Sequence, residues 1–179
     1  GRQSAMKSKR NSWDANRPSK ECFDIILEMS SVQIIWGGNY FADLLPPSMR
    51  WLAWDKCQRN FTLADFELAW TSQNAAARAF NLSRSQAALD GKENHATPKP
   101  IALMQWCLGF LPGAKTILDP FMGSGTTLVA CAKVGRKGIG IELDPDYFQI
   151  ACERVQKAYD QPDLFVPAPS PPEQEAMDL

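Results

Sequence analysis

The sequence predicts an α/β fold whose sheet is mostly parallel and twisted and carries helices on both faces. The clearest sign is the stretch 116–143, where a short apolar run, a glycine-rich turn, a helix-length segment and a second apolar run follow one another. Further apolar runs at 32–36, 49–56 and 66–71 are bounded by turn-forming residues, which is typical of strands. Strands that alternate with helical segments favour parallel pairing through helical crossovers.

Composition is that of an ordinary soluble globular domain. The 179 residues are 45% hydrophobic and 22% charged. No apolar run approaches the ~18 residues that a membrane span needs. The five cysteines are scattered, form no Cys-x-x-Cys pair and accompany a single histidine. These counts predict a reduced, cytoplasmic protein with neither a metal site nor a membrane segment.

The two ends differ in charge from the domain expected at 19–160. Residues 1–20 contain six Lys or Arg side chains against one Asp, so residues 1–18 are predicted to form a basic loop or arm. Such a segment could contact phosphates or simply aid solubility. Residues 161–179 contain five prolines and four acidic residues with no Lys or Arg, which predicts a disordered acidic tail.

The first half of the domain is predicted to contain strands and short helices around a tryptophan-rich core. Ser19 is suited to cap a helix because its side chain can accept a backbone hydrogen bond, and Pro46-Pro47 ends a second, short helix. Trp51, Trp54 and Trp70 are expected in the core, since tryptophan buries a large area. The predicted helices are 19–30 and 40–45, and the predicted strands are 32–36, 49–56 and 66–71.

The second half begins with a polar stretch, 72–94, in which the alanines at 75–77 suggest some helix. Ser124 is a candidate N-cap for the helix that follows the glycine turn, and Asp144 can cap the last helix. The predicted helices are 101–111, 126–134 and 144–160, and the predicted strands are 116–118 and 137–143.

Two acidic residues, Asp119 and Glu142, stand at the carboxyl ends of the strands that flank the glycine turn. In a parallel sheet these ends meet at one edge, where the N-terminus of the intervening helix also lies. Acids here suit a ligand with a cationic group and a ribose, whose hydroxyls Glu142 would bind. The glycines alone would fit an ordinary turn equally well.

The glycine turn and its neighbours carry a family resemblance. Asp119 to Thr127, DPFMGSGTT, resembles the S-adenosylmethionine motif of the DNA amino-methyltransferases, which modify adenine N6 or cytosine N4. Residues 140–148, GIELDPDYF, are similar to the following motif of that family, whose glutamate holds the ribose. Residues 95–100, HATPKP, resemble the segment that precedes the motif in the permuted, beta-type members. The resemblance implies a Rossmann-like methyltransferase fold with a permuted strand order.

The resemblance also implies S-adenosylmethionine as cofactor and DNA as partner. Lys99 and Thr97 would approach the carboxylate at the methionine end, which needs a cation. Pro98 replaces the glutamine or glutamate that is usual between them. DNA contacts are expected from residues 1–20 and from a recognition insert at 73–94. The implied cofactor residues are Thr97, Lys99, Asp119, Phe121, Gly123, Ser124, Gly125, Thr126, Glu142 and Leu143.

The sequence lacks the Asp/Asn/Ser-Pro-Pro-Tyr/Phe/Trp turn with which this family holds the target base. The nearest match, Leu45-Pro46-Pro47-Ser48, has an apolar first residue and no aromatic one. In permuted members the turn would precede Gly1, so we expect a sheet that is incomplete at the N-terminus and no catalytic residue in this chain. The exposed sheet edges would then favour a homodimer.

Three functions fit these features, and a DNA methyltransferase that prefers adenine N6 to cytosine N4 is favoured. A non-catalytic module that binds cofactor or DNA is the second, supported by the missing tetrapeptide. An RNA methyltransferase is the third, because the same cofactor site would serve it. A nicotinamide dehydrogenase is disfavoured, since residues 123–128, GSGTTL, lack the third glycine of the dehydrogenase motif.

Overall fold

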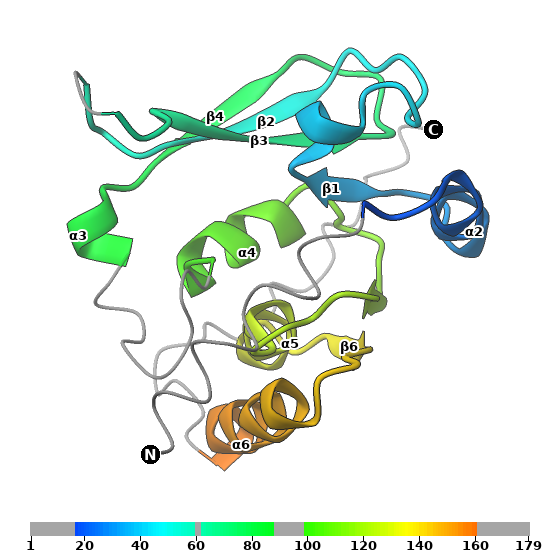
Figure 1. Ribbon diagram of the computed structural model, residues 1–179. Helices are drawn as coiled ribbons and strands as arrows, with labels where there is room; N and C mark the ends of the chain where they lie inside the picture. The colour runs from blue at the N-terminus through cyan, green and yellow to red at the C-terminus, as the bar shows by residue number, and fades with distance from the viewer. Residues whose placement is uncertain (1–16, 60–61, 88–98, 161–179) are drawn as a thin grey trace, which may run out of the picture. The chain divides into compact units, whose positions relative to one another are not determined.

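The structure, a computed structural model, describes residues 17–59, 62–87 and 99–160 (Figure 1). The chain divides into two compact units between Leu82 and Ser83. Each unit has its own strands and its own packing, so each is described by itself. The predicted arm at 1–18 falls almost wholly outside the described residues, and the predicted tail at 161–179 and Thr97 fall outside them entirely.

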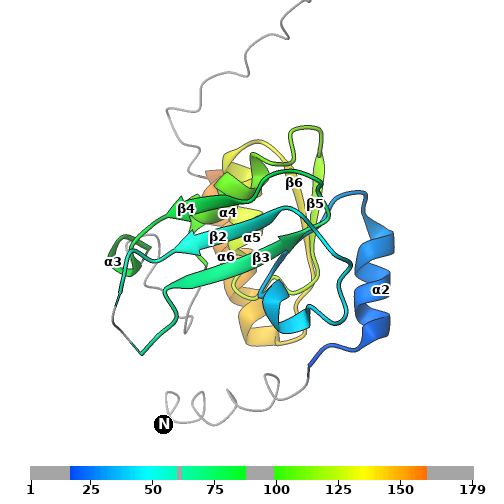
Figure 2. The same cartoon turned by 90° about the horizontal axis from the view of Figure 1, so that it is seen from above.

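The first unit is built on a four-stranded sheet of order β1-β3-β2-β4, in which β3, β2 and β4 can be followed side by side in Figure 2. β3 pairs antiparallel with both β1 and β2, whereas β4 pairs parallel with β2. The elements are α2 (Lys20–Met29), β1 (Ile34–Trp36), the 3₁₀ helix η1 (Gly38–Phe41), β2 (Trp51–Asp55), β3 (Phe66–Thr71) and β4 (Arg78–Asn81).

Strand direction in this unit differs from the mostly parallel sheet that the sequence predicted. The reason is the length of the connection between β2 and β3, residues 56–65, which is short for the crossover that parallel strands need. The two strands therefore form a hairpin, with Trp51 opposite Trp70 and Asp55 opposite Phe66. The predicted parallel arrangement is found between β2 and β4.

The core of the first unit forms where the sequence places its tryptophans. Phe23, Leu45 and Trp70 pack together, and Trp70 is 2% exposed. The indole N–H groups of Trp54 and Trp70 find backbone acceptors, as buried tryptophans require: Trp70 donates to the carbonyl of Pro46 and Trp54 to that of Leu82, both at 2.8 Å. Core positions are thus confirmed for Trp54 and Trp70, while Trp51 is half-buried.

Local signals predicted the start of α2 but missed a strand and misplaced the second helix, which is the 3₁₀ helix η1 at Gly38–Phe41 instead of a helix at 40–45. Ser19 caps α2 as expected, accepting a hydrogen bond from the N–H of Cys22 at 3.4 Å. The helix suggested at 75–77 is wrong: these residues lie in the loop before a strand that was not predicted, β4 at Arg78–Asn81. Pairing with β2 holds residues 78–81 extended.

The second unit contains a parallel β-α-β crossover. β5 (Thr116–Asp119) and β6 (Lys137–Gly140) are parallel neighbours, and α5 (Thr126–Lys133) connects them and packs on both. α4 (Ile101–Leu108) and α6 (Pro145–Asp160) pack against α5, and the short α3 (Arg84–Ala87) begins the unit. These elements confirm the α/β class and the predicted order of strand, turn, helix and strand.

Side chains from α4 and α5 form the core of this unit, and one arginine closes the end of α4. Leu103, Val129 and Cys131 are almost fully buried. Arg136 donates to the carbonyls of Leu108 and Leu111 at 2.9 and 2.8 Å. A cation at a helix C-terminus stabilises the unpaired carbonyls there. Across the described ranges, no helix has the length and apolarity needed to cross a bilayer.

Gly38→Ala should destabilise the first unit, because a Cβ at this position would lie 2.5 Å from Cβ of Trp70 and 3.0 Å from its backbone nitrogen. We expect a loss of about 1–3 kcal/mol in the free energy of unfolding, the usual result of overpacking. Urea denaturation followed by tryptophan fluorescence measures it. Gly113→Ala is the control, since its Cβ would meet nothing within 4 Å. Equal midpoints for the two variants would contradict the packing described here.

Cys131 should resist alkylation in the folded protein. Burial raises the pKa of its thiol to about 11, and only the thiolate reacts, so about 0.1% is reactive at pH 8. The folded-state pKa lies above the ordinary value of 9.0, so the proton on this thiol stabilises the folded state, and this contribution is fully present below pH 9.0. This contribution is lost as the pH rises through about 11. Iodoacetamide labelling with peptide mass spectrometry should find the exposed Cys57 and Cys152 modified first.

Candidate functional site

The ends of β5 and β6 lie side by side, and the backbone continues their pairing past both strands. Asp119 stands opposite Gly140 in the parallel register. The N–H of Ile141 donates to the carbonyl of Asp119 at 2.9 Å, and the N–H of Met122 donates to the carbonyl of Ile141 at 3.1 Å. The segments that carry the two predicted acids are therefore held together by backbone hydrogen bonds.

The glycine turn between β5 and α5 uses left-handed backbone conformations. Gly123 has φ 52° and Gly125 has φ 77°, values that residues with a side chain rarely adopt. Gly125 also lies against α6, because a Cβ there would be 2.9 Å from Cβ of Ala151. Glycine at 125 is thus required twice, for the turn and for close packing of the helix.

Ser124 does not cap α5, contrary to the prediction. The N-cap residue is Gly125, which has no side chain to accept a hydrogen bond. Ser124 is only 4% exposed, and its hydroxyl and carbonyl face Arg154 of α6 instead. A ligand in front of the turn would therefore meet the backbone at this position rather than the Ser124 hydroxyl.

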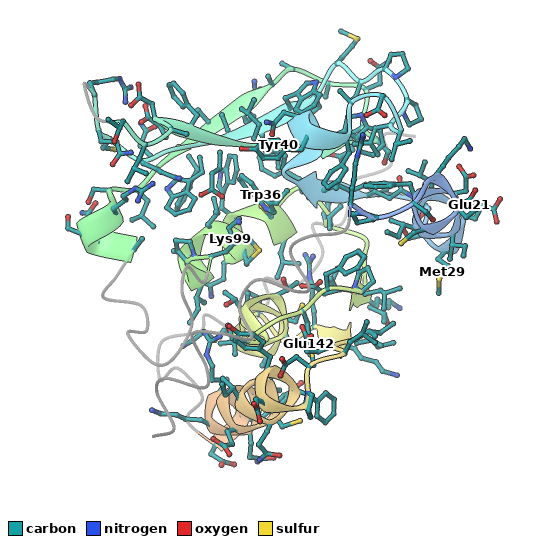
Figure 3. All side chains as sticks on the ribbon, viewed as in Figure 1. Glu21, Met29, Trp36, Tyr40, Lys99 and Glu142 are labelled. Carbon is teal, nitrogen blue, oxygen red and sulfur yellow. The ribbon has the colours of Figure 1, made fainter. Side chains whose placement is uncertain are left out.

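Glu142 joins the glycine turn to the beginning of α6 (Figure 3). One carboxylate oxygen accepts the N–H of Gly123 at 2.9 Å, and the other accepts the N–H of Asp144 at 2.9 Å. Asp144 in turn caps α6, accepting from the N–H groups of Asp146 and Tyr147. Each carboxylate oxygen has a second lone pair, so both oxygens of Glu142 can accept a further hydrogen bond from a ligand.

Asp119 is positioned by its own turn. Its Oδ1 accepts the N–H of Phe121 at 3.1 Å, which fixes the carboxylate at the end of β5. It is half-buried, like Glu142, and α5 begins a few residues later. The partial positive charge of a helix N-terminus favours acidic groups in such a place. Two carboxylates give this edge of the sheet a negative potential that suits a cationic ligand.

Exposed apolar side chains follow each acid. Phe121 is 62% exposed and Leu143 is 93% exposed. A large apolar side chain beside polar ligand-binding groups is typical of small-molecule sites, where apolar contacts supply binding area and polar groups fix orientation. The pair therefore suits a flat ring next to the groups that Glu142 would bind.

Arg154 is a member of the site that the sequence analysis missed. It reaches the turn from α6, and its Nη1 donates to the Ser124 carbonyl at 2.5 Å, the Ser124 hydroxyl at 2.7 Å and the Thr126 hydroxyl at 3.2 Å. No local pattern shows this contact, because Arg154 reaches the turn through the packing of Ala151 on Gly125, three residues away on the same face of α6.

Of the two residues predicted to bind the methionine end of the cofactor, the structure describes only Lys99. Thr97 lies outside the described residues. Lys99 stands just before α4, whose N-cap is Pro100, and Figure 3 shows it on a different element from Glu142. α4 is joined to α5 next to the turn, since the Thr127 hydroxyl contacts the Met104 sulfur at 3.7 Å. The described residues contain no cluster of three or more His, Cys, Asp or Glu that could hold a metal ion.

The fold and the site together define a class of α/β protein that binds a nucleotide-type ligand at the carboxyl ends of parallel strands. A family model described as DNA methylase, for N6 and N4 methyltransferases, matches residues 3–153. The chain belongs to this DNA methylase family. The family assignment agrees with the resemblance that the glycine turn carries.

Curated relatives agree with this assignment. The type II methyltransferase M.SmaI of Serratia marcescens is 44% identical over 64 residues, which are 35% of this chain and 22% of that protein. The DNA adenine methyltransferase YhdJ of Escherichia coli K12 is 34% identical over 91 residues, 50% of this chain and 31% of YhdJ. The chain thus spans less than a third of either relative.

The structure of an M1.HpyAVI–SAM complex resembles this chain with a TM-score of 0.52 and 27% sequence identity. The match covers 69% of this chain and 74% of that one. The Rossmann-like methyltransferase fold predicted from the sequence is confirmed by this likeness.

Glu142→Gln should weaken the second unit by about 1–3 kcal/mol, because one oxygen becomes an NH₂ group that faces a backbone N–H and leaves that donor unpaired. The free energy of unfolding, measured by urea denaturation with circular dichroism, reports this loss. Glu153→Gln is the matched control, since Glu153 is exposed and its oxygen accepts from the exposed Gln149. If both substitutions had the same small effect, the bridging role of Glu142 would be wrong.

Proposed function

We propose that this chain binds S-adenosylmethionine at the ends of β5 and β6 and serves methyl transfer to an exocyclic amine of DNA, with adenine N6 favoured over cytosine N4. The observation that carries the proposal is the Glu142 carboxylate, fixed by two backbone N–H groups and open to two more hydrogen bonds. The DNA methylase family supports the reaction. The name of YhdJ, a DNA adenine methyltransferase, supports the base.

The residues present fit this cofactor. Glu142 would accept hydrogen bonds from the two ribose hydroxyls with its remaining lone pairs. Asp119, at the end of the neighbouring strand, would face the positively charged sulfur. When bound, S-adenosylmethionine supplies a methyl group activated by the positive charge of its sulfonium. The protein's part is to hold that group in one place, because methyl transfer depends on alignment with the attacking nitrogen.

Apolar side chains would hold the adenine end of the cofactor, and polar or charged groups would hold its methionine end. Phe121 and Leu143 are exposed apolar side chains beside the two acids and would contact the adenine ring. The N-terminus of α5 carries a partial positive charge that suits an anionic group, while the N–H groups of Gly123 and Gly125 already donate to Glu142 and to the Met122 carbonyl. Lys99 and Thr97 are proposed to contact the methionine carboxylate from the segment before α4.

Methyl transfer to an exocyclic amine requires groups beyond those that bind the cofactor. The lone pair of an exocyclic amine is delocalised into the base, so an enzyme must draw on the N–H hydrogens and hold the flipped base by stacking. No catalytic residue is assigned here, and the tetrapeptide that would do this in the family is absent from the 179 residues. Residues 1–20 and 73–94 are proposed to contact DNA phosphates.

Two other functions have some support. The absent tetrapeptide favours a module that binds cofactor without transferring methyl groups. An RNA methyltransferase would use the same cofactor site. Methyl transfer from labelled S-adenosylmethionine to DNA, in competition with RNA of the same sequence, separates these functions. Nucleoside analysis of the product then distinguishes N6-methyladenine from N4-methylcytosine.

Asp119→Asn should weaken S-adenosylmethionine binding roughly 10- to 100-fold, measured by calorimetric titration. The substitution removes the negative charge that would face the sulfonium and keeps Oδ1, which accepts the Phe121 N–H. The fold should therefore survive, and a thermal melt checks this.

Asp146→Asn is the matched control, because it removes the same charge from an exposed position on α6. If the Asp119→Asn protein binds as well as the wild type, the role of Asp119 is refuted. A folded wild-type chain that does not bind would refute the proposed cofactor site as a whole.

A further inference from the structure

The geometry points to Arg154 as a positioning residue that, together with Glu142, holds the glycine turn in its binding conformation. This inference rests on the proposed function and adds a residue to the same site. Arg154 belongs to α6, well beyond the turn in sequence, and is not among the residues that the sequence analysis assigned to the cofactor.

One nitrogen of Arg154 donates to three acceptors that belong to buried residues of the turn and the start of α5. Its Nη1 donates to both oxygen atoms of Ser124, the carbonyl at 2.5 Å and the hydroxyl at 2.7 Å, and to the hydroxyl of Thr126 at 3.2 Å. Ser124 is 4% and Thr126 is 7% exposed. Buried oxygens need partners within the protein, and hydrogen bonds from a charged donor are stronger than neutral ones.

The position of these acceptors explains what the contact does. Ser124 lies between Gly123 and Gly125, both of which have left-handed φ values. Glycine reaches such conformations easily and also leaves them easily, because it has the greatest backbone freedom of any residue. Arg154 holds the one residue of the turn that lies between these two pivots, while Glu142 holds the N–H of Gly123.

The turn is therefore fixed at two successive residues by two oppositely charged side chains from two segments. A ligand that binds against an already ordered turn does not lose affinity to the entropy of ordering it. Loss of Arg154 should leave the composition of the site unchanged and increase the freedom of the turn. Its effect on binding thus passes through the backbone of residues 123–126.

The test uses the full chain with three substitutions, Arg154→Met, Arg154→Lys and Lys157→Met. Lys157 is the matched control, an exposed basic residue about one turn further along α6. We expect Arg154→Met to weaken S-adenosylmethionine binding about 10- to 100-fold in calorimetric titration. Arg154→Lys should restore part of the affinity because it keeps a charged donor, and Lys157→Met should bind like the wild type.

Hydrogen exchange without cofactor provides the second measurement. In Arg154→Met the amides of residues 123–126 should exchange faster than in the wild type, while those of β5 and β6 stay protected. If Arg154→Met does not fold, Ser124→Ala removes one acceptor with less disruption, and it should accelerate exchange at the same amides.

The outcomes separate the two proposals. Folded Arg154→Met with unchanged exchange at 123–126, or with wild-type affinity, overturns the positioning role. Faster exchange at the turn in a protein whose wild type binds no S-adenosylmethionine upholds the contact with the turn and overturns the proposed function instead. Equal losses in Arg154→Met and Lys157→Met would mean that charge on α6 matters and that the contact with Ser124 does not.

Discussion

The hydrogen bond from the Gly123 N–H to the Glu142 carboxylate is the contact on which the candidate site depends. It joins the glycine turn after β5 to the segment after β6 at a level where the strands themselves have ended. The second oxygen of Glu142 holds the N–H of Asp144, and Asp144 caps α6. α6 then returns to the turn, packing Ala151 on Gly125. One carboxylate thus sets both the turn and the helix that packs on it.

This arrangement keeps the site negative while satisfying its buried polar groups. Backbone N–H groups are neutral donors, so they occupy lone pairs of Asp119 and Glu142 without cancelling the charge. Arg154, the cation that holds the turn, is directed to neutral oxygens of Ser124 and Thr126. The two acids keep their negative charge and have lone pairs left to accept hydrogen bonds. A ligand with a cationic sulfonium and two ribose hydroxyls matches both properties.

Local patterns predicted the parts of the structure that local interactions create. The caps Ser19 and Asp144 and the β-α-β unit around the glycine turn were predicted because their signals lie within a few residues. Ser124 was expected to cap α5 for the same reason, yet its hydroxyl binds an arginine from the next helix, a contact no local pattern shows. β4 was missed because its pairing with β2, and not its own composition, makes it a strand.

The division of the chain shows what the cofactor site does and does not need. Every predicted site residue that the structure describes, from Lys99 to Leu143, belongs to the second unit, as does Arg154. The mixed sheet of the first unit supplies none of the residues proposed to bind S-adenosylmethionine. Base recognition needs groups that stack on the base and bind its amine, and these differ from the groups proposed to bind S-adenosylmethionine. The groups proposed to bind the cofactor therefore lie within one unit of the chain, and the geometry around Glu142 supports that part of the proposal.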